Sequence, residues 1–107
     1  MYGEYTVWTK RKEIIIRITG KIRVKFDMRT GDVGQTIFGR IYVNDMAMGI
    51  ERSTTSEVYV TYSEDFFIGA GEKVQLWAKA TTPNDYYRNF RIYYDKSVLV
   101  EGEVTLN

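Results

Sequence analysis

The chain contains neither cysteine nor histidine. Without cysteine there is no disulfide and no thiolate nucleophile, and without both residues the usual nitrogen and sulfur ligands of zinc are missing. Catalysis of the Ser–His–Asp and Cys–His kinds is excluded for the same reason. General acid–base chemistry would fall to carboxylates, lysine or tyrosine, whose pKa values must shift far to act near neutral pH. We therefore expect a protein that is not an enzyme and that carries no cofactor and no metal.

Long apolar runs are also missing. No stretch approaches the ~18 apolar residues of a transmembrane helix, so we expect no membrane insertion. The first ten residues, MYGEYTVWTK, lack a basic region followed by an apolar stretch, so we expect no ordinary signal peptide. The 107 residues are 44% hydrophobic and 27% charged with net charge +1, which fits one domain over 1–107. Asn and Gln are scarce beside many charged residues, as in proteins of thermophiles.

What is present is an alternation of apolar and polar side chains with a period of two. In GKIRVKFDM, residues 20–28, Ile22, Val24, Phe26 and Met28 share one face, which indicates a half-buried strand. The same alternation recurs in 72–80, 56–63 and 89–95, and 97–106 is a further apolar, β-rich stretch. Short turn signals separate about eight to ten such segments. We predict an all-β fold, a two-sheet antiparallel β-sandwich of jelly-roll-like type, with an immunoglobulin-type sandwich as the nearest alternative.

The stretch RIYVNDMAMGIERSTTS, residues 40–56, predicts a hairpin. Asn44 and Asp45 both tolerate the left-handed backbone angles of a two-residue type I′ turn. In that register five side chains point to one face, which we expect to be the core: Ile41, Val43, Met46, Met48 and Ile50. Copper ligation by the two methionines would need further soft ligands or histidine. Because the chain offers no histidine or cysteine, core packing is the favoured interpretation.

A basic strip follows the odd positions in and around strand 21–28. Its members are Arg17, Lys21, Arg23, Lys25 and Arg29. Such a strip suits nucleic acid phosphates or an acidic partner. A protein that binds single strands also places aromatic rings on the same face, and positions 21, 23, 25 and 27 provide none. We therefore favour a charged outer sheet face that prevents aggregation, with nucleic acid as the less favoured partner.

Four aromatic side chains fall on the face of their strand opposite its core residues, and a cation lies beside one of them. They are Tyr42, Tyr59, Trp77 and Tyr93, with Arg91 next to Tyr93. A row of exposed rings with polar neighbours suits either a subunit interface or a carbohydrate platform. Large aromatics that only cover a sheet are the alternative. We favour subunit contact, and a carbohydrate-binding module around Trp77, with a host-surface glycan as ligand, is the second hypothesis.

Half of the chain carries a resemblance. Segments 41–44, 49–56, 62–65, 70–79 and 88–93 read IYVN, GIERSTTS, YSED, AGEKVQLWAK and RNFRIY. In this order they resemble virion-associated β-sandwich proteins of phages and archaeal viruses, of the capsid-decoration, tail or fibre type. Asp45 stands where that pattern has glycine, and aspartate also accepts the turn. Residues 1–36 lie outside the resemblance.

The resemblance implies a non-enzymatic structural protein located in the virion. It would act through surface recognition and through packing with copies of itself or with other virion proteins. The resemblance transfers no catalytic residue. A carbohydrate-binding module and a basic nucleic-acid-binding viral protein are the alternatives.

Overall fold

A computed structural model of the chain describes residues 7–94 and contains eight strands and no helix in that range. All-β structure is confirmed. The strands are β1 (Thr9–Ile15), β2 (Gly20–Thr30), β3 (Ile37–Val43), β4 (Met46–Ala47), β5 (Arg52–Thr54), β6 (Val60–Ile68), β7 (Lys73–Ala80) and β8 (Asp85–Tyr94). The candidate strand at 97–106 lies outside the described residues. With no helix in the described range, nothing there forms a helix long and apolar enough to cross a membrane.

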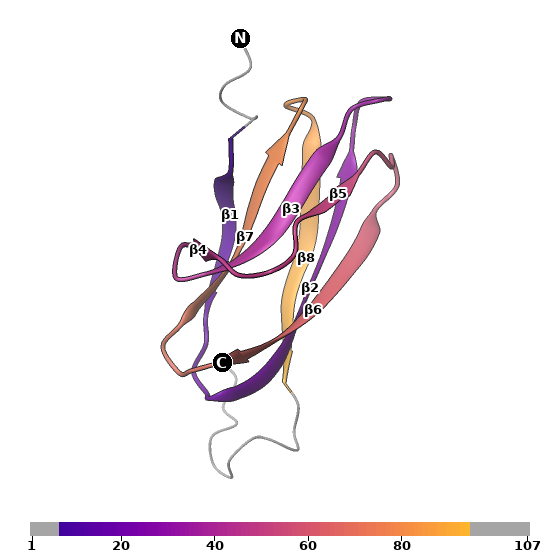
Figure 1. The fold of residues 1–107 in the computed structure, drawn as a ribbon. Coiled ribbons are helices and arrows are strands. Elements are labelled where there is room, and N and C mark those ends of the chain that lie inside the picture. Colours follow the sequence, from indigo (N-terminus) through magenta and orange to yellow (C-terminus); the bar gives the residue numbers. More distant parts are fainter. Residues whose placement is uncertain (1–6, 95–107) are drawn as a thin grey trace.

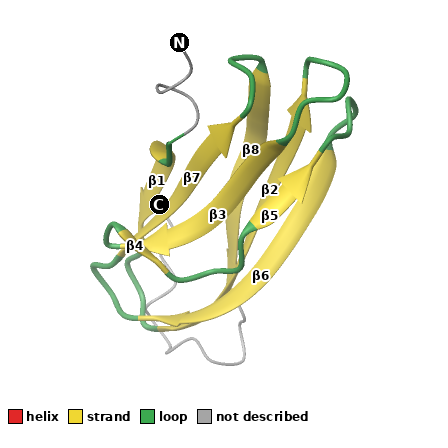
Figure 2. Ribbon diagram, turned by 45° about the horizontal axis from the view of Figure 1, so that its top comes forward, coloured by secondary structure: helices red, strands yellow, loops and turns green. Residues whose placement is uncertain are grey.

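The strands form two antiparallel sheets that pack face to face (Figures 1 and 2). The larger sheet has the order β1-β7-β3-β4, with β5 also paired to β3, and the smaller has the order β6-β2-β8. The chain passes between the sheets repeatedly. Strands β2, β6 and β8 belong to the smaller sheet, and the strands between them along the chain belong to the larger one. The predicted two-sheet sandwich is therefore confirmed, while its jelly-roll connectivity stays a prediction.

The core lies between the sheets and follows the period of two. Ile22, Val24 and Met28 of β2 are at most 1% exposed, and so are Val74 and Leu76 of β7 on the facing sheet. Burying each of these side chains contributes about 1.5–3 kcal/mol. The partly buried side chains of β8 that pack against this core are Tyr87, Phe90, Ile92 and Tyr94.

The predicted hairpin turn is confirmed. Asn44 and Asp45 have φ angles of 52° and 67°, and Val43 pairs with Met46 across them. These are the left-handed angles that a two-residue type I′ turn requires at both central positions. On the first strand of the hairpin, Ile41 and Val43 are buried as expected.

The prediction that the second strand of the hairpin faces the core is wrong. Three side chains expected in the core are 58–67% exposed: Met46, Met48 and Ile50. Regular pairing stops after two residues, because the amides of Met48 and Gly49 both donate to the carbonyl of Ile41, at 3.1 and 2.9 Å. The backbone amide of Ile50 then donates to the carboxylate of Glu64 on β6. The chain has left the ladder there, so the parity of the hairpin no longer sets where its side chains point.

Candidate functional site

The outward-facing surface of the three-stranded sheet brings together six Lys or Arg side chains, four aromatic rings and two carboxylates. Strand β2 lies in the middle of this sheet, and its odd-numbered residues point away from the core. The flanking strands place side chains beside them in register, with Phe67 opposite Lys21, Tyr93 opposite Arg23 and Tyr86 opposite Arg29. We call this surface the cationic face; its members are Lys21, Arg23, Lys25, Arg29, Arg88 and Arg91, with the rings of Tyr59, Phe67, Tyr86 and Tyr93 and the carboxylates of Asp27 and Asp65.

The net positive charge of the described chain lies on this face. It carries six Lys or Arg side chains against two carboxylates. The remainder of residues 7–94 carries eight Lys or Arg and eight Asp or Glu. A surface of one sign on an otherwise balanced domain attracts ligands of the opposite sign and raises their association rate.

At one end of the face, arginine and tyrosine side chains alternate in a stack. The guanidinium carbon of Arg88 lies 3.7 Å from the ring centre of Tyr59. Arg29 lies between the rings of Tyr59 and Tyr86, at 5.2 and 4.3 Å. A guanidinium stacked on a ring keeps its edge donors available for a phosphate or carboxylate. This end therefore presents oriented cations beside Tyr86, which is 42% exposed.

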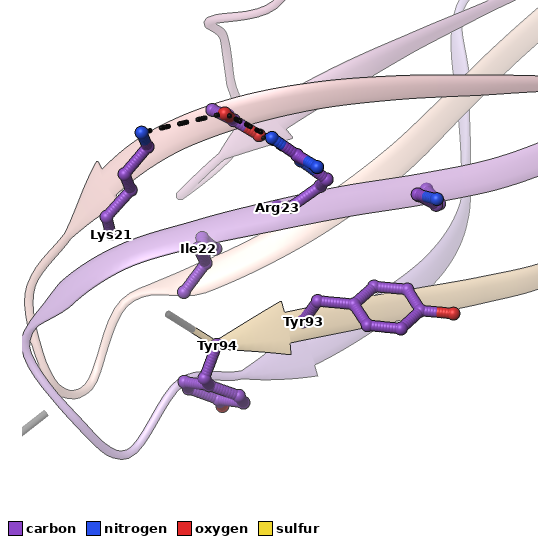
Figure 3. Close-up of a pocket in the computed structure, with 7 residues that line it drawn as sticks. Lys21, Ile22, Arg23, Tyr93 and Tyr94 are labelled. Atoms are coloured by element: carbon purple, nitrogen blue, oxygen red, sulfur yellow. Dashed lines mark hydrogen bonds and ion pairs between the residues drawn. The ribbon is translucent and has the colours of Figure 1, made fainter. Parts of the chain in front are cut away.

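At the other end, Tyr93 is 49% exposed and the ammonium of Lys25 lies 5.3 Å from its ring centre. Arg23 donates two hydrogen bonds to Asp65, at 2.8 and 3.1 Å, and Lys21 approaches the same carboxylate at 3.8 Å (Figure 3). The hydrogen bonds from Arg23 hold the pKa of Asp65 below its usual value. A hollow of about 340 Å³ opens among these side chains, so this end is both charged and concave.

In the middle of the face, Asp27 is only 4% exposed. Its carboxylate accepts hydrogen bonds from Thr61 at 2.8 Å, Asn89 at 2.9 Å, Arg88 at 3.3 Å and Arg91 at 3.5 Å. Burial by itself would raise the pKa of Asp27, but the hydrogen bonds and the charge of Arg91 outweigh it and lower that pKa. Asp27 is therefore a buried anion beneath the two arginines.

A β-bulge in β8 brings Arg88 and Arg91 together. In a regular strand, residues three apart point to opposite faces. Here Arg91 pairs with Lys25 and Arg88 with Asp27, so β8 has one residue more than β2 in this interval. Asn89 has φ 54° at the bulge, a left-handed angle that asparagine tolerates better than most residues. Sequence reasoning missed this arrangement, and the Arg–Asn pair at 88–89 was its only local hint.

The predicted basic strip is only partly one surface. Lys21, Arg23, Lys25 and Arg29 lie on the cationic face, whereas Arg17 is exposed in the connection between β1 and β2. The expectation that this face lacks aromatic rings is true of β2 alone and wrong for the face. Its rings come from β8, from β6 and from the residue just before β6, which periodicity along a single strand does not reveal.

The predicted aromatic row is not a single surface. Tyr59 and Tyr93 lie on the cationic face, beside Arg91, whose Nε donates to the Tyr93 hydroxyl at 3.1 Å. Tyr42 and Trp77 instead lie on the outer face of the larger sheet, where their rings stack at 4.3 Å with 9° between their planes. Each of these two rings therefore covers one face of the other.

Comparisons of the chain with known protein families, with curated proteins and with solved structures gave no match. Among residues 7–94, no three or more Asp or Glu side chains gather as ligands for a metal ion.

Proposed function

We propose that this chain is a non-enzymatic binding domain that holds single-stranded nucleic acid on its cationic face. One observation carries the proposal: cations and partly exposed aromatic rings are interleaved on one open sheet surface that holds the net positive charge of the described chain. Lysine and arginine neutralise phosphates, and exposed rings stack on bases without regard to sequence. Single-strand binders combine these two features on one surface.

The size and shape of the face support the proposal. From Lys21 to Arg29, β2 extends about 26 Å at the usual rise of a strand. That length suits the smaller site sizes of single-strand binders, roughly four nucleotides and upward. The surface is a sheet rather than an exposed helix, so it has no element of the kind that most often enters the major groove of a duplex. We expect little sequence preference.

The alternative ligand, a carbohydrate, is less well supported. Sugar platforms use an open aromatic ring face, and Tyr42 and Trp77 each cover one face of the other. The indole nitrogen of Trp77 already donates to the amide oxygen of Gln75 at 2.9 Å. Trp77 therefore offers a sugar at most one ring face, and its indole donor is already used.

The virion-associated structural role is a second candidate, favoured by exposed apolar side chains away from the cationic face. The side chains of Met46, Met48 and Ile50, in and just after β4, are all more than half exposed. Exposed apolar patches typically mark contacts between proteins. Light scattering tests this role, because a trimer or pentamer supports it and a strict monomer contradicts it. Absence of the protein from purified virus particles would also contradict it. The two roles are compatible.

Fluorescence anisotropy with labelled oligo(dT) and RNA of about 12 nucleotides, at about 50 mM salt, tests the nucleic acid proposal. We expect binding that weakens steeply as salt rises, because counterions are released from the phosphates. Lys25→Glu is expected to weaken binding about tenfold, and Tyr93→Ala about fivefold or more, by loss of phosphate and base contacts. No binding by the unmodified chain would overturn the proposal.

Lys79→Glu is the matched control, because it makes the same charge change on the outer face of the larger sheet, where Lys79 contacts the rings of Trp8 and Phe38. An equal loss in Lys79→Glu and Lys25→Glu would show that net charge alone attracts the ligand, against the proposal. Heparin separates nucleic acid from a general polyanion, since it has no bases. Because Tyr93→Ala removes a base contact that heparin cannot make, it is expected to weaken heparin binding less than oligo(dT) binding.

A further inference from the structure

The arrangement around Asp27 is more specific than charge attraction requires. A carboxylate in the centre of a face that binds polyanions reduces the positive charge there. Asp27 is nevertheless 4% exposed and accepts four hydrogen bonds, two of them from arginines of the same face. The β-bulge of β8 is what allows both arginines to reach it. Bulges are often placed where a side chain must be re-aimed toward a functional site.

We infer that Asp27 is a positioning residue, which holds Arg88 and Arg91 as a fixed pair of donors for a phosphodiester group at the centre of the cationic face. This inference rests on the proposed function and names the contact through which it works. Asp27 would not touch the ligand. It acts through the two guanidinium groups, whose orientation it sets from beneath.

The hydrogen bonds leave the outer donors of both arginines available. Asp27 accepts from Nε of Arg88 and from Nη1 of Arg91, which also donates to the carbonyl of Asn89. Nε of Arg91 donates to the Tyr93 hydroxyl. Within residues 7–94, both terminal nitrogens of Arg88 and Nη2 of Arg91 make no hydrogen bond. Fixed guanidinium groups of this kind match the geometry of a phosphate better than lysine does.

The neighbours of the pair fit a phosphate as well. Arg88 is stacked on Tyr59, which restrains its plane in addition to the contact with Asp27. Lys25 lies beside Arg91 across the strand pair and adds a further positive charge. Side chains that are already immobilised lose less conformational entropy when they bind, so a fixed pair binds more tightly than two mobile arginines would.

Charge alone and positioning predict opposite results for Asp27→Asn. Removing the carboxylate makes the face more positive, so attraction by charge alone predicts tighter binding of oligo(dT). Positioning predicts binding that is weaker by about fivefold or more, because both arginines lose their anchor. Tighter or unchanged binding in a folded Asp27→Asn protein would overturn the inference.

A second set of variants decides the question even where Asp27→Asn does not fold. Arg88→Lys and Arg91→Lys keep the charge and lose the planar fork, so each is expected to weaken binding about fivefold with little change in the salt dependence. Arg17→Lys is the matched control, because it makes the same exchange at an exposed position outside the cationic face, and it is expected to bind within about twofold of the unmodified chain. If Arg88→Lys and Arg91→Lys both bind as tightly as the unmodified chain, the inference is overturned and the proposed function stays intact. Failure of the unmodified chain to bind oligo(dT) would overturn both the proposed function and this inference.

Discussion

Gly39 of β3 lies against the ring of Phe26 on the facing strand β2. A Cβ atom at position 39 would be 2.9 Å from Cε2 of that ring and 3.1 Å from the sulfur of Met28. Both neighbours belong to the buried inner face of β2, at 2% and 0% exposure. The absence of a side chain at position 39 therefore lets the two sheets approach each other at the centre of the sandwich.

The first prediction concerns Gly39→Ala. The added methyl group overlaps Phe26 and the sulfur of Met28, so we expect it to lower the free energy of unfolding by about 1–3 kcal/mol. Urea denaturation followed by circular dichroism measures the change. Gly69→Ala is the control, since its Cβ would meet only Glu72, at an ordinary 3.6 Å, and it should stay within about 0.5 kcal/mol of the parent. A Gly39→Ala protein as stable as the parent would contradict the packing described.

The second prediction separates the two classes of methionine. Met28 is fully buried and Met48 is 58% exposed. Met28→Ala is expected to lower the free energy of unfolding by about 2–5 kcal/mol, through lost burial and the cavity left behind. Met48→Ala is expected to change it by less than about 0.5 kcal/mol. Equal losses in the two variants would contradict the exposed position of Met48 and would support the inward-facing hairpin expected from the sequence.

The residues that sequence reasoning placed correctly are those whose position depends on their own strand. The alternation in β2 and β7 predicts their inner faces because only one face of each strand is buried against the facing sheet. Asn44 and Asp45 set the hairpin turn through their own backbone angles. Parity shows neither where a ladder ends, which misplaced Met48, nor whether the facing sheet covers an edge strand such as β4, which misplaced Met46.

The residues that sequence reasoning missed depend on contacts between distant segments of the chain. The alternation in 72–80 places Gln75 among the polar side chains, opposite Val74 and Leu76, yet Gln75 is 0% exposed. Its amide donates to Glu13 of β1 and to Asp45 of the hairpin turn, both at 2.9 Å, and its oxygen accepts from Trp77. These partners come from separate parts of the chain, as do the rings of the cationic face. Local sequence patterns carry no information about contacts between residues that are distant in the sequence.

The third prediction concerns the pH dependence of stability. Within residues 7–94, four carboxyl groups have a pKa below their ordinary values in the folded protein: Glu13, Asp27, Asp32 and Asp65. For Glu13 and Asp65 the main cause is a hydrogen bond from a cation, Lys10 and Arg23 respectively, and for Asp32 it is one from Thr82. A lowered folded pKa stabilises the protein above the unfolded values of about 3.9–4.3, and that stability is lost as pH falls through the folded values. We expect the free energy of unfolding to decrease steadily below about pH 4.

Asp27→Asn isolates one contribution to this loss. At pH 7 the variant lacks the charged hydrogen bonds of Asp27 and is expected to be less stable by about 1.5–3 kcal/mol. In strong acid Asp27 of the parent is itself protonated, so the difference between the two proteins should shrink as pH falls. Urea denaturation from pH 7 down to about pH 2 measures it. Glu57→Gln removes an exposed carboxylate away from this cluster, and at pH 7 it should leave stability within about 0.5 kcal/mol of the parent. A stability difference for Asp27→Asn that stays constant with pH would show that lost packing, and not lost charge, separates the variant from the parent.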